Sequence, residues 1–542
     1  MAREVGQAQK LAVSKPTGFL NGRGARGRRW SGKPAGPWIT ARKTIQVAAL
    51  AACVALAHGV GSRSGGWAAN LANVPMRLDP LVMLAHLLSS RTLLLGSALS
   101  LLILLLTLVA GRAWCGWLCP LGTVLDLFSP RRWREKPAPP PEAWRAIKYG
   151  LLLTTLLAAL FGNLTLLILD PLTLFFRTLT VSVWPAINQI ATLAETTLYR
   201  LPFLAEPIST FDTWLRPGLL PAEPARYREA LLFAAVFAGL IALNLVASRF
   251  WCRYLCPLGG LLGLLSKAAL LRREVAEECK GCTLCTTVCP TGTVNPARGY
   301  ASDPGECTLC LDCLEVCPRR SITFAPGFAL AARQAYDPGR REFLTAFGAT
   351  LAAIALFRSD WAARREAPHL LRPPGARENH LLEKCIRCGE CLRACPTTAL
   401  QPALAEAGAE GLWTPFLVTR AGYCDYACNA CGQICPVQAI PPLSLEEKRT
   451  RVIGKAYIDQ NRCIAWADHR DCIVCEEMCP IPDKAIRLEK AEATRADGAR
   501  VSVQLPHVIR ERCIGCGICE YKCPVNGEAA IRVYVPEAEA SI

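Results

Sequence analysis

Four long apolar runs divide the N-terminal half of the chain. They span residues 44–60, 92–110, 149–169 and 230–247, and polar or proline-rich stretches separate them. Each run is close to the roughly 20 residues that an α-helix needs to cross the hydrocarbon core of a membrane. Buried helices of a soluble core are the alternative, but four uncharged runs of this length favour membrane helices. The pattern therefore predicts an α-helical membrane domain with four transmembrane helices over residues 44–270.

Lysine and arginine are unevenly distributed between the segments that join these runs. Segments 1–43, 111–148 and 249–341 hold 29 of these residues in 174 positions, whereas segments 61–91 and 170–228 hold 8 in 90. Cytoplasmic loops carry the excess of positive charge in membrane proteins, so the first three segments are predicted to be cytoplasmic and the other two external. Residues 1–43 are also glycine-rich, which predicts a disordered basic tail.

The membrane half contains an internal repeat. The stretch WCGWLCPLG from residue 114 returns as WCRYLCPLG from residue 251, and Arg112 and Arg249 precede the two copies at the same offset. Such duplication predicts two similar helix pairs that face each other across a pseudo-symmetry axis. Asp79 and Asp170, each followed by Pro-Leu, are also repeated. We interpret these two as helix N-caps with proline at the first helical position, with proton acceptors at a quinol site as the alternative.

Cysteine content changes the picture most. Among 542 residues there are 29 cysteines, which fall into six groups of four, two pairs and the single Cys53. Disulfide frameworks belong to small secreted domains, so tight quartets in a long chain predict metal ligation. The pattern excludes a soluble hydrolase, a disulfide-stapled secreted module and a disordered scaffold.

The formal net charge of +17 counts all these cysteines as neutral thiols. Six cubane clusters held by four thiolates each would contribute roughly −12 and leave about +5. The remaining positive charge is distributed as in a membrane protein and does not form a patch for nucleic acid.

Two cysteine quartets lie within residues 271–330, where we predict a cytoplasmic two-cluster ferredoxin domain. Both have the C-x2-C-x2-C-x3-C-P spacing of bacterial ferredoxins, in which three close cysteines hold one 4Fe–4S cluster and the fourth reaches the neighbouring cluster. A zinc ribbon, the alternative, pairs two C-x2-C knuckles and does not need the C-x3-C-P ending. The ferredoxin rule predicts one ligand set of Cys279, Cys282, Cys285 and Cys317 and a second of Cys307, Cys310, Cys313 and Cys289.

Four further quartets occupy residues 361–542 and all end in Cys-Pro. The first and last have the standard spacing, the second has one extra residue in its first gap, and the third has eight residues there. They predict a four-cluster ferredoxin domain and, with the first two quartets, six 4Fe–4S clusters and an α+β ferredoxin-like fold beside the helical membrane domain. Consecutive and nested pairing of the quartets both remain open. The quartets are Cys385, Cys388, Cys391 and Cys395; Cys424, Cys428, Cys431 and Cys435; Cys463, Cys472, Cys475 and Cys479; and Cys513, Cys516, Cys519 and Cys523.

The two remaining cysteine pairs belong to the repeated motifs. Cys115 and Cys119, like Cys252 and Cys256, are four residues apart and share one helix face, and the proline that follows predicts a change of helix direction. Both motifs lie at the predicted cytoplasmic border, where four thiolates can converge as one ligand set. Three interpretations remain open: a seventh cluster, a dithiol redox or transient metal site, and plain packing.

A short motif separates the two groups of quartets. Arg340 and Arg341 are followed by Glu-Phe-Leu-Thr and the apolar run 343–357, which resembles a twin-arginine export signal. That route carries folded, cofactor-loaded domains, which suits clusters assembled in the cytoplasm. An ordinary basic flank of a surface helix is the alternative. With such a signal, residues 331–360 form an uncleaved signal anchor and residues 361–542 lie in the periplasm.

Several other redox signatures are missing from the sequence. It has no C-x-x-C-H motif for haem attachment, and its Gly-Val-Gly at 59–61 follows an apolar run instead of a strand. No constellation for substrate catalysis is present. We interpret His58 and His86 as packing residues near the external border, with haem ligation or contact with a quinone headgroup as alternatives. Cys53 is predicted to be a core residue.

Together these motifs resemble the quinol-oxidising module of periplasmic nitrate reductase systems. Residues 41–320, with four apolar runs, two C-x3-C-P motifs and two ferredoxin quartets, are similar to the membrane polyferredoxin of these systems, their quinol dehydrogenase. Residues 339–535, with the twin-arginine motif and four quartets, are similar to the exported four-cluster ferredoxin that partners it. Methylamine-utilisation ferredoxin-type proteins share parts of this plan. The chain thus resembles a fusion of a membrane polyferredoxin and an exported ferredoxin.

The resemblance implies a multi-pass protein of the bacterial inner membrane that conducts electrons. It implies contact with membrane lipid and the quinone pool, quinol as the electron donor, and a periplasmic redox enzyme or cytochrome as the acceptor. Two other functions remain open. The protein can deliver electrons for maturation or assembly of a partner metalloenzyme, or it can carry them outward from a cytoplasmic low-potential donor without quinone.

Overall fold

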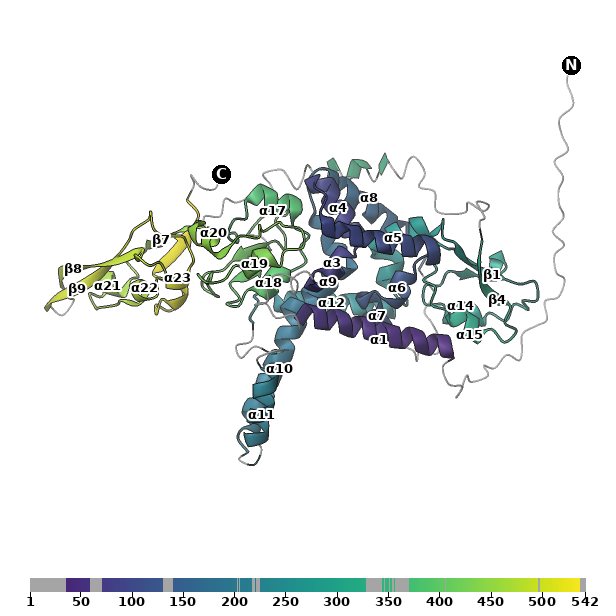
Figure 1. Ribbon diagram of the computed structural model, residues 1–542, viewed down its shortest axis with the longest axis horizontal. Coiled ribbons are helices and arrows are strands. Elements are labelled where there is room, and N and C mark those ends of the chain that lie inside the picture. Colours follow the sequence, from purple (N-terminus) through teal and green to yellow (C-terminus); the bar gives the residue numbers. More distant parts are fainter. Residues whose placement is uncertain are drawn as a thin grey trace, which may run out of the picture.

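The computed structural model describes residues 36–58, 71–129, 140–327 and 370–536, with short gaps in the last two ranges, and parts of 344–355. The twin-arginine motif and most of the basic tail lie outside these residues. The described chain forms three parts in a row (Figure 1). A central helical part runs to residue 270, a first ferredoxin part (271–327) lies at one end, and a second ferredoxin part (370–536) lies at the other.

The helical part combines long apolar helices with short ones that begin at proline. In its core, α8 packs against α4 and α13, and α13 packs against α5. Its helices are α1 (Pro37–His58), α3 (Val74–Arg77), α4 (Pro80–Ser90), α5 (Ala98–Ala110), α6 (Ala113–Trp117), α7 (Pro120–Leu127), α8 (Ala146–Leu160), α9 (Pro171–Thr178), α10 (Trp184–Leu198), α11 (Ala205–Leu215), α12 (Ala230–Ala242) and α13 (Pro257–Ser266), with π-helical turns at η4 (Leu179–Val183) and η7 (Trp251–Leu255).

Two helices within the described residues are long and apolar enough to cross a membrane, Pro37–Ala57 and Glu142–Leu160. The expected spans 92–110 and 230–247 contain shorter apolar helices, Ala98–Ala110 and Ala230–Leu245. The α-helical nature of this part agrees with the sequence pattern. Four transmembrane helices remain a prediction.

Two boundaries differ from the expected ones. Helix α1 begins at Pro37, inside the segment expected to be a disordered tail, and Arg42 on this helix donates to Asp312 of the first ferredoxin part at 2.8 Å. The run 149–169 is not one helix, because Gly162 takes a left-handed conformation (φ 78°) after α8 ends at Leu160. Such a residue ends a helix and turns the chain.

Asp79 and Asp170 are N-caps, as the Asp-Pro pattern predicts. Asp79 accepts from the backbone N–H groups of Leu81 and Val82 at 2.8 and 3.1 Å and begins α4. Asp170 begins α9 in the same way, with two acceptor distances of 3.0 Å. Both side chains are fully buried. The two repeats therefore start equivalent helices inside the helical part.

The two ferredoxin parts consist of short helices and two-stranded antiparallel sheets, with β1 paired to β4, β2 to β3, β5 to β6, β7 to β10 and β8 to β9. Only the β8–β9 hairpin is long among the described strands. The elements are β1 (Leu271–Val275), α14 (Leu284–Val288), β2 (Val294–Asn295), β3 (Ala301–Ser302), α15 (Asp312–Val316), β4 (Ile322–Pro326), α17 (Glu378–Lys384), α18 (Glu390–Ala394), β5 (Leu400–Pro402), β6 (Pro415–Leu417), α19 (Ala430–Gln433), α20 (Leu445–Thr450), β7 (Lys455–Ile458), α21 (Ile464–Ala467), α22 (Val474–Glu477), β8 (Ile486–Thr494), β9 (Arg500–Val508), α23 (Ile518–Lys522) and β10 (Ile531–Tyr534).

The ferredoxin parts contact different loops of the helical part. Trp117, in a segment predicted to be cytoplasmic, donates its indole N–H to the Leu309 carbonyl of the first ferredoxin part at 2.8 Å. Asn73, in a segment predicted to be external, donates to the Ile434 carbonyl of the second part at 2.8 Å. The two groups of cysteine quartets therefore lie at opposite ends of the helical part (Figure 1).

Candidate metal centres

The 24 quartet cysteines gather into six groups of four. Five groups line a cavity each, and in the sixth Cys395 lies within electrostatic reach of three cysteines of the neighbouring quartet. Each group takes three cysteines from one quartet and one from its partner. The groups are Cys279, Cys282, Cys285 and Cys317; Cys307, Cys310, Cys313 and Cys289; Cys385, Cys388, Cys391 and Cys435; Cys424, Cys428, Cys431 and Cys395; Cys463, Cys472, Cys475 and Cys523; and Cys513, Cys516, Cys519 and Cys479.

This grouping pairs the quartets consecutively along the chain. The first two groups coincide with the two ligand sets expected from the ferredoxin spacing. In the second ferredoxin part, the quartets that begin at Cys385 and Cys424 exchange their last cysteines. The quartets that begin at Cys463 and Cys513 do the same. The nested arrangement, which the sequence left open, is not the one adopted.

An unusual backbone bends the standard quartets around their cavities. In each of the four, the residues before and after the second cysteine have positive φ, from 50° to 85°. A left-handed backbone conformation costs a residue other than glycine about 1–2 kcal/mol. Four of these eight positions hold a residue other than glycine. The residues are Gly281 and Thr283, Leu309 and Leu311, Arg387 and Gly389, and Gly515 and Gly517. The sharp turn wraps three thiols around one space, which suits a cubane.

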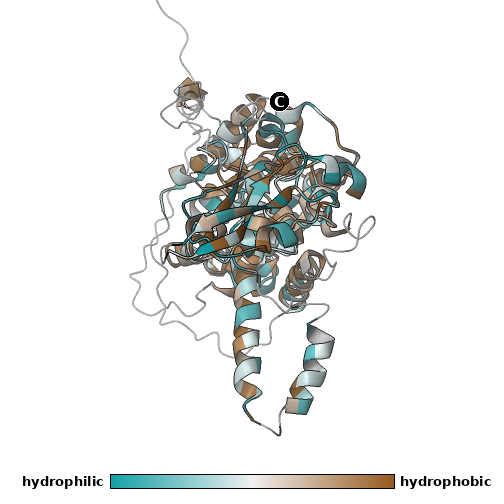
Figure 2. Ribbon diagram, turned by 90° about the vertical axis from the view of Figure 1, so that its left-hand side faces the viewer, coloured by the Kyte–Doolittle hydropathy of each residue, from teal (hydrophilic) through white to brown (hydrophobic). Residues whose placement is uncertain are grey.

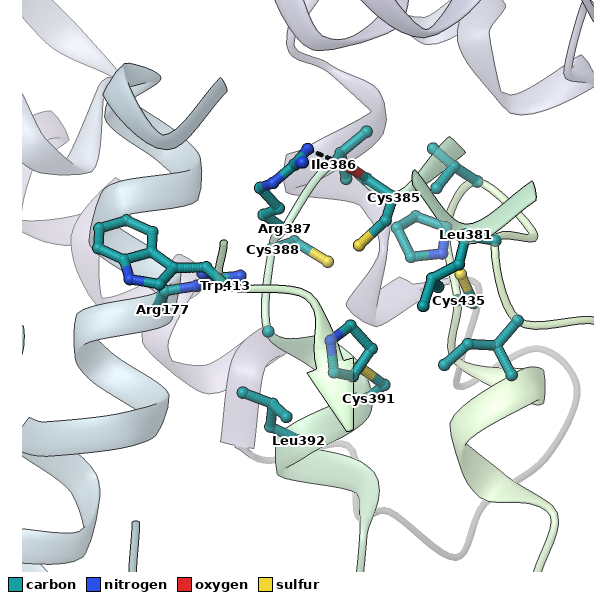
Figure 3. Close-up of a pocket in the computed structure, with 16 residues that line it drawn as sticks. Arg177, Leu381, Cys385, Ile386, Arg387, Cys388, Cys391, Leu392, Trp413 and Cys435 are labelled. Atoms are coloured by element: carbon teal, nitrogen blue, oxygen red, sulfur yellow. Dashed lines mark hydrogen bonds between the residues drawn. The ribbon is translucent and has the colours of Figure 1, made fainter. Parts of the chain in front are cut away.

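The cavity of Cys385, Cys388, Cys391 and Cys435 encloses about 410 Å³, including the space open to solvent. Figure 3 shows the four thiols pointing into it and Arg177 of α9 beside Trp413 on the side of the helical part. The Arg177 guanidinium lies 5.0 Å from the Trp413 ring centroid. It is buried, and its Nε and Nη1 atoms have no hydrogen-bond partner among the described residues. Burial lowers the pKa of Arg177 to about 10, so it stays a cation at neutral pH.

A second buried arginine attaches this centre to the helical part. Arg387 lies between Cys385 and Cys388 and donates to the Cys385 carbonyl at 3.0 Å. Its other amino group donates to the Thr165 hydroxyl of the helical part, also at 3.0 Å. A centre whose loop is held in this way has a defined position relative to the helices.

The four cysteines of the repeated motifs are buried together inside the helical part. Cys115 lies within electrostatic reach of Cys119, Cys252 and Cys256. All four belong to one hydrophobic core that also contains Cys385 and Cys388 of the second ferredoxin part. The structure thus brings the two motifs together, in the way that convergence of the repeats predicts.

The arginines that precede the motifs cross over between the repeats. Arg112 of the first repeat donates to the Cys252 carbonyl of the second at 3.2 Å, and Arg249 of the second donates to the Cys115 carbonyl of the first at 3.1 Å. Arg249 also pairs with Asp126 at 2.7 Å. Burial raises the pKa of Cys252 to about 11, and the two arginines lower it only in part, so a bound metal is what would hold these thiols as thiolates.

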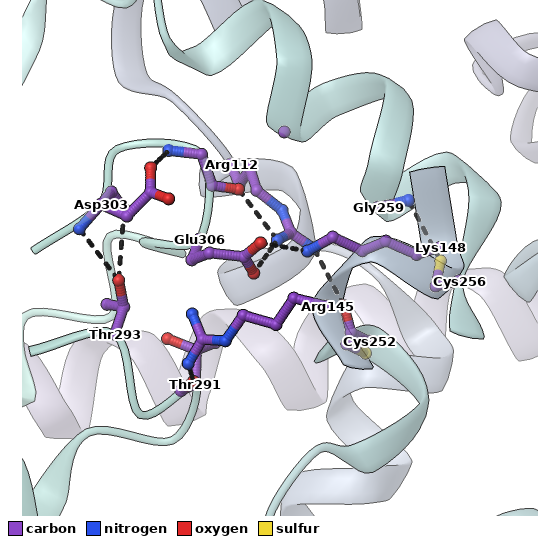
Figure 4. A network of polar contacts seen from close by, with 12 residues as sticks. Arg112, Arg145, Lys148, Cys252, Cys256, Gly259, Thr291, Thr293, Asp303 and Glu306 are labelled. Atoms are coloured by element: carbon purple, nitrogen blue, oxygen red, sulfur yellow. Dashed lines mark hydrogen bonds and ion pairs between the residues drawn. The ribbon is translucent and has the colours of Figure 1, made fainter. Parts of the chain in front are cut away.

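Glu306 of the first ferredoxin part completes this charge network (Figure 4). Its carboxylate accepts from Arg112 at 3.2 Å and forms an ion pair with Lys148. The three side chains are at most 3% exposed. Since a buried charge is tolerated only when it is paired, this triad ties the first ferredoxin part to both helix pairs.

The first repeat also approaches the first ferredoxin part through a glycine. A Cβ built on Gly116 would lie 2.2 Å from the Thr308 carbonyl oxygen, so only glycine fits there. Thr308 lies between Cys307 and Cys310 of one cluster group. In the second repeat the equivalent position is Arg253, and this repeat approaches the loop that follows Cys289 instead, where Ser248 donates to the Pro290 carbonyl at 3.0 Å.

Other candidates from the sequence do not join these groups. Cys53 is half-buried and packs against the core, and His86 is buried on α4. Among the described residues, no three His, Cys, Asp or Glu side chains are placed to share a single metal ion. Sequence reasoning missed Arg177 and Glu306, because their partners are far away in the chain. A single arginine in the otherwise apolar start of α9 was the one local signal.

Comparison with known proteins agrees with this chemistry. A family model described as a 4Fe–4S binding domain matches residues 92–137 and 229–275, the two stretches that contain the C-x3-C-P motifs. A 4Fe–4S dicluster domain model matches residues 299–396, and a further 4Fe–4S binding domain model matches residues 506–527. No solved structure matches the chain significantly.

The curated relatives are ferredoxin-type proteins. The methylamine utilization ferredoxin-type protein MauM of Methylorubrum extorquens is 39% identical over 206 residues, which are 36% of this chain and 89% of the relative. The ferredoxin-type protein NapG of Escherichia coli is 35% identical over 202 residues, 36% of this chain and 85% of the relative. Together with the quartets, these matches identify an iron–sulfur electron-transfer protein. The chain belongs to the family of ferredoxin-type 4Fe–4S proteins that includes MauM and NapG.

Proposed function

We propose that the protein is a membrane-bound electron conduit that oxidises quinol and passes electrons to a periplasmic redox enzyme. The observation that carries the proposal is the succession of cysteine groups along the molecule. Two groups lie in the first ferredoxin part and four lie in the second (Figure 1). Between them, in the helical part, lie the four thiols of the repeated motifs, here called the motif thiols: Cys115, Cys119, Cys252 and Cys256. Bound 4Fe–4S clusters would supply one-electron transfer at these positions.

The four motif thiols are proposed to hold a seventh cluster. They are the only carriers of redox chemistry that the described helices place between the two ferredoxin parts. On one side Gly116 touches the loop of Cys307 and Cys310, and on the other the thiols share a core with Cys385 and Cys388. The match of a 4Fe–4S family model to both motifs supports cluster binding over plain packing. A seventh carrier here joins groups that would otherwise be separated by the helices.

The apolar helices and the uneven Lys/Arg content support a membrane placement. We propose that the first ferredoxin part is cytoplasmic and the second periplasmic, reached through a twin-arginine signal, so that the chain is a natural fusion of a membrane polyferredoxin and an exported ferredoxin. The first ferredoxin part contacts a segment rich in Lys and Arg through Trp117, and the second contacts a segment poor in them through Asn73. Both contacts support this topology.

A second candidate function is outward transfer from a soluble cytoplasmic donor. Cys282 of the first ferredoxin part is exposed, which would let a donor approach that cluster closely. This function uses the same carriers and differs only in the source of the electrons.

Stopped-flow reduction under anaerobic conditions separates the two donors. Oxidised protein purified from membranes is mixed with a reduced menaquinol or ubiquinol analogue, and the visible absorbance of the clusters is followed. The proposal expects bleaching within a catalytic turnover time. Absence of bleaching, in protein that dithionite still reduces, would contradict quinol as the donor and favour the cytoplasmic one.

A further inference from the structure

A helical arm projects from the side of the helical part. Helix α9, buried along its whole length, continues through η4 into α10, and α11 folds back beside α10. Figures 1 and 2 both show this arm extending away from the rest of the molecule. Its base is attached to the start of α12, because the Ser182 hydroxyl donates to the Ala230 carbonyl at 2.6 Å.

One edge of α10 is polar and faces α11. Arg216, just after α11, donates to Asn188 and Thr192 at 3.0 Å each and pairs with Glu195. Positions 188, 192 and 195 share one helix face. These contacts fix the rotation of α10 about its own axis. They therefore determine which side chains lie on the edge that faces away from α11.

The other edge of α10 is apolar and exposed. Ile187, Ile190 and Leu193, spaced three residues apart, are 45%, 66% and 61% exposed, and Phe203 between the two helices is 74% exposed. Isolated apolar side chains are ordinary on protein surfaces, but a continuous apolar edge marks an interaction site.

The direction of the arm identifies what covers this edge. Helix α1, the longer candidate span, runs along the long axis of the molecule in Figure 1, and the arm runs crosswise to it. Figure 2, which looks along this axis, shows the arm extending away from it. The N-terminal end of α1 contacts the first ferredoxin part through Arg42, and Figure 1 shows the arm leaving near the opposite end of α1. If α1 spans the membrane, a helix that runs crosswise to it and leaves near its end lies along the surface of the bilayer.

We propose that the α10–α11 arm lies in the external lipid–water interface, with Ile187, Ile190 and Leu193 inserted at the boundary of the acyl chains. This inference rests on the membrane placement proposed above. Amphipathic helices bind there through buried apolar area plus attraction to anionic lipid. Residues 184–215 contain three carboxylates and one arginine, so apolar insertion holds the arm, and zwitterionic lipid suffices.

Site-specific photo-crosslinking in the full chain tests the arm. A benzophenone amino acid replaces Ile190 and, as matched control on the polar side of the same helix, the exposed Thr196. A third variant replaces Leu231 of α12, which is 86% exposed on an apolar helix. Each protein is irradiated in vesicles of zwitterionic phospholipid, and adducts are identified by mass spectrometry, with cluster absorbance as the check on folding.

The proposal expects a phospholipid adduct at positions 190 and 231 and several-fold less at 196. Lipid at 231 with none at 190 would overturn the arm proposal and leave the membrane placement standing. A protein adduct at 190 would overturn it in favour of a second copy or a partner. Lipid at neither position would overturn the arm and the membrane placement together.

Discussion

At the scale of single residues, Arg177 shows how the helical part acts on a centre of the second ferredoxin part. It reaches the cavity of Cys385, Cys388 and Cys391 from α9 and carries a buried charge with free donors. A nearby cation stabilises the more negative, reduced state of a cluster and so raises its reduction potential. Contact between the helical part and the second ferredoxin part would therefore set the reduction potential of this cluster as well as its distance from the helices.

Arg177→Met is expected to lower the reduction potential of this cluster. For a charge separation of roughly 8 Å and an effective dielectric constant of about 20, the lost interaction is about 2 kcal/mol, or roughly 90 mV for one electron. A redox titration followed by electron paramagnetic resonance measures the change. Arg177→Lys keeps the charge and should restore most of the potential; an unchanged potential in Arg177→Met would refute this role.

Gly116→Ala tests the contact between the first repeat and the first ferredoxin part. The added Cβ meets the Thr308 carbonyl, so the backbone must shift, at a cost of about 1–3 kcal/mol. Denaturant unfolding should show this loss, and reduction of the second ferredoxin part by quinol should slow. Gly150→Ala is the matched control, because a Cβ there meets nothing within 4 Å. Equal behaviour of the two variants would contradict a tight contact.

At the scale of elements, Glu306 connects a loop of the first ferredoxin part to α8 and to the first repeat. Burial alone would raise the pKa of Glu306, but Lys148 and Arg112 outweigh it, so the pKa lies below its usual value of 4.5. A carboxyl with a lowered pKa stabilises the folded state fully above its usual pKa, and this contribution is lost as the pH falls through the folded-state value.

Glu306→Gln should therefore destabilise the protein at neutral pH, because two buried cations lose their partner. Breaking a buried ion pair costs about 3–5 kcal/mol. Unfolding measured from neutral pH down to pH 4 should show a smaller acid dependence in the variant than in the parent protein. A loss below about 1 kcal/mol would mean that water already screens these charges.

Removal of iron should affect the ferredoxin parts more than the helices. The buried core of the first ferredoxin part consists of Cys285, Cys313, Val294 and Ile322, so cysteines that we predict to be cluster ligands supply half of it. Binding energy at such sites is folding energy. After chelation under oxidising conditions, hydrogen exchange should rise in α14 and α15 and stay slow in α8. Protection retained in α14 and α15 would show that these elements fold without metal.

Local patterns predicted some elements well and others poorly. Asp79 and Asp170 cap their helices as the Asp-Pro pattern indicates, because capping involves neighbours in sequence. The prediction of a single helix across the run 149–169 was wrong, because hydrophobicity alone does not show that Gly162 takes a left-handed conformation. Pairing in the second ferredoxin part and the role of Arg177 depend on packing between distant segments, which spacing does not reveal.

At the scale of the whole molecule, the cysteine groups form one succession from the first ferredoxin part to the second (Figure 1). The pseudo-symmetric repeats bring two cysteine pairs to one place, and the crossed contacts of Arg112 and Arg249 hold the repeats together. Both repeats contact the first ferredoxin part, Gly116 at Thr308 and Ser248 at Pro290. We infer from this arrangement that the motif thiols connect the two groups of clusters.

The most direct test is reduction of the second ferredoxin part in the double variant Cys115→Ser/Cys119→Ser, with Cys53→Ser as the matched control. Iron and sulfide analysis first establishes that the six quartet clusters are assembled. Rapid freeze-quench electron paramagnetic resonance then follows the clusters after mixing with quinol. We expect the four clusters of the second ferredoxin part to stay oxidised in the double variant and to become reduced in the control. Reduction at the same rate in both proteins would contradict a connecting role for the motif thiols.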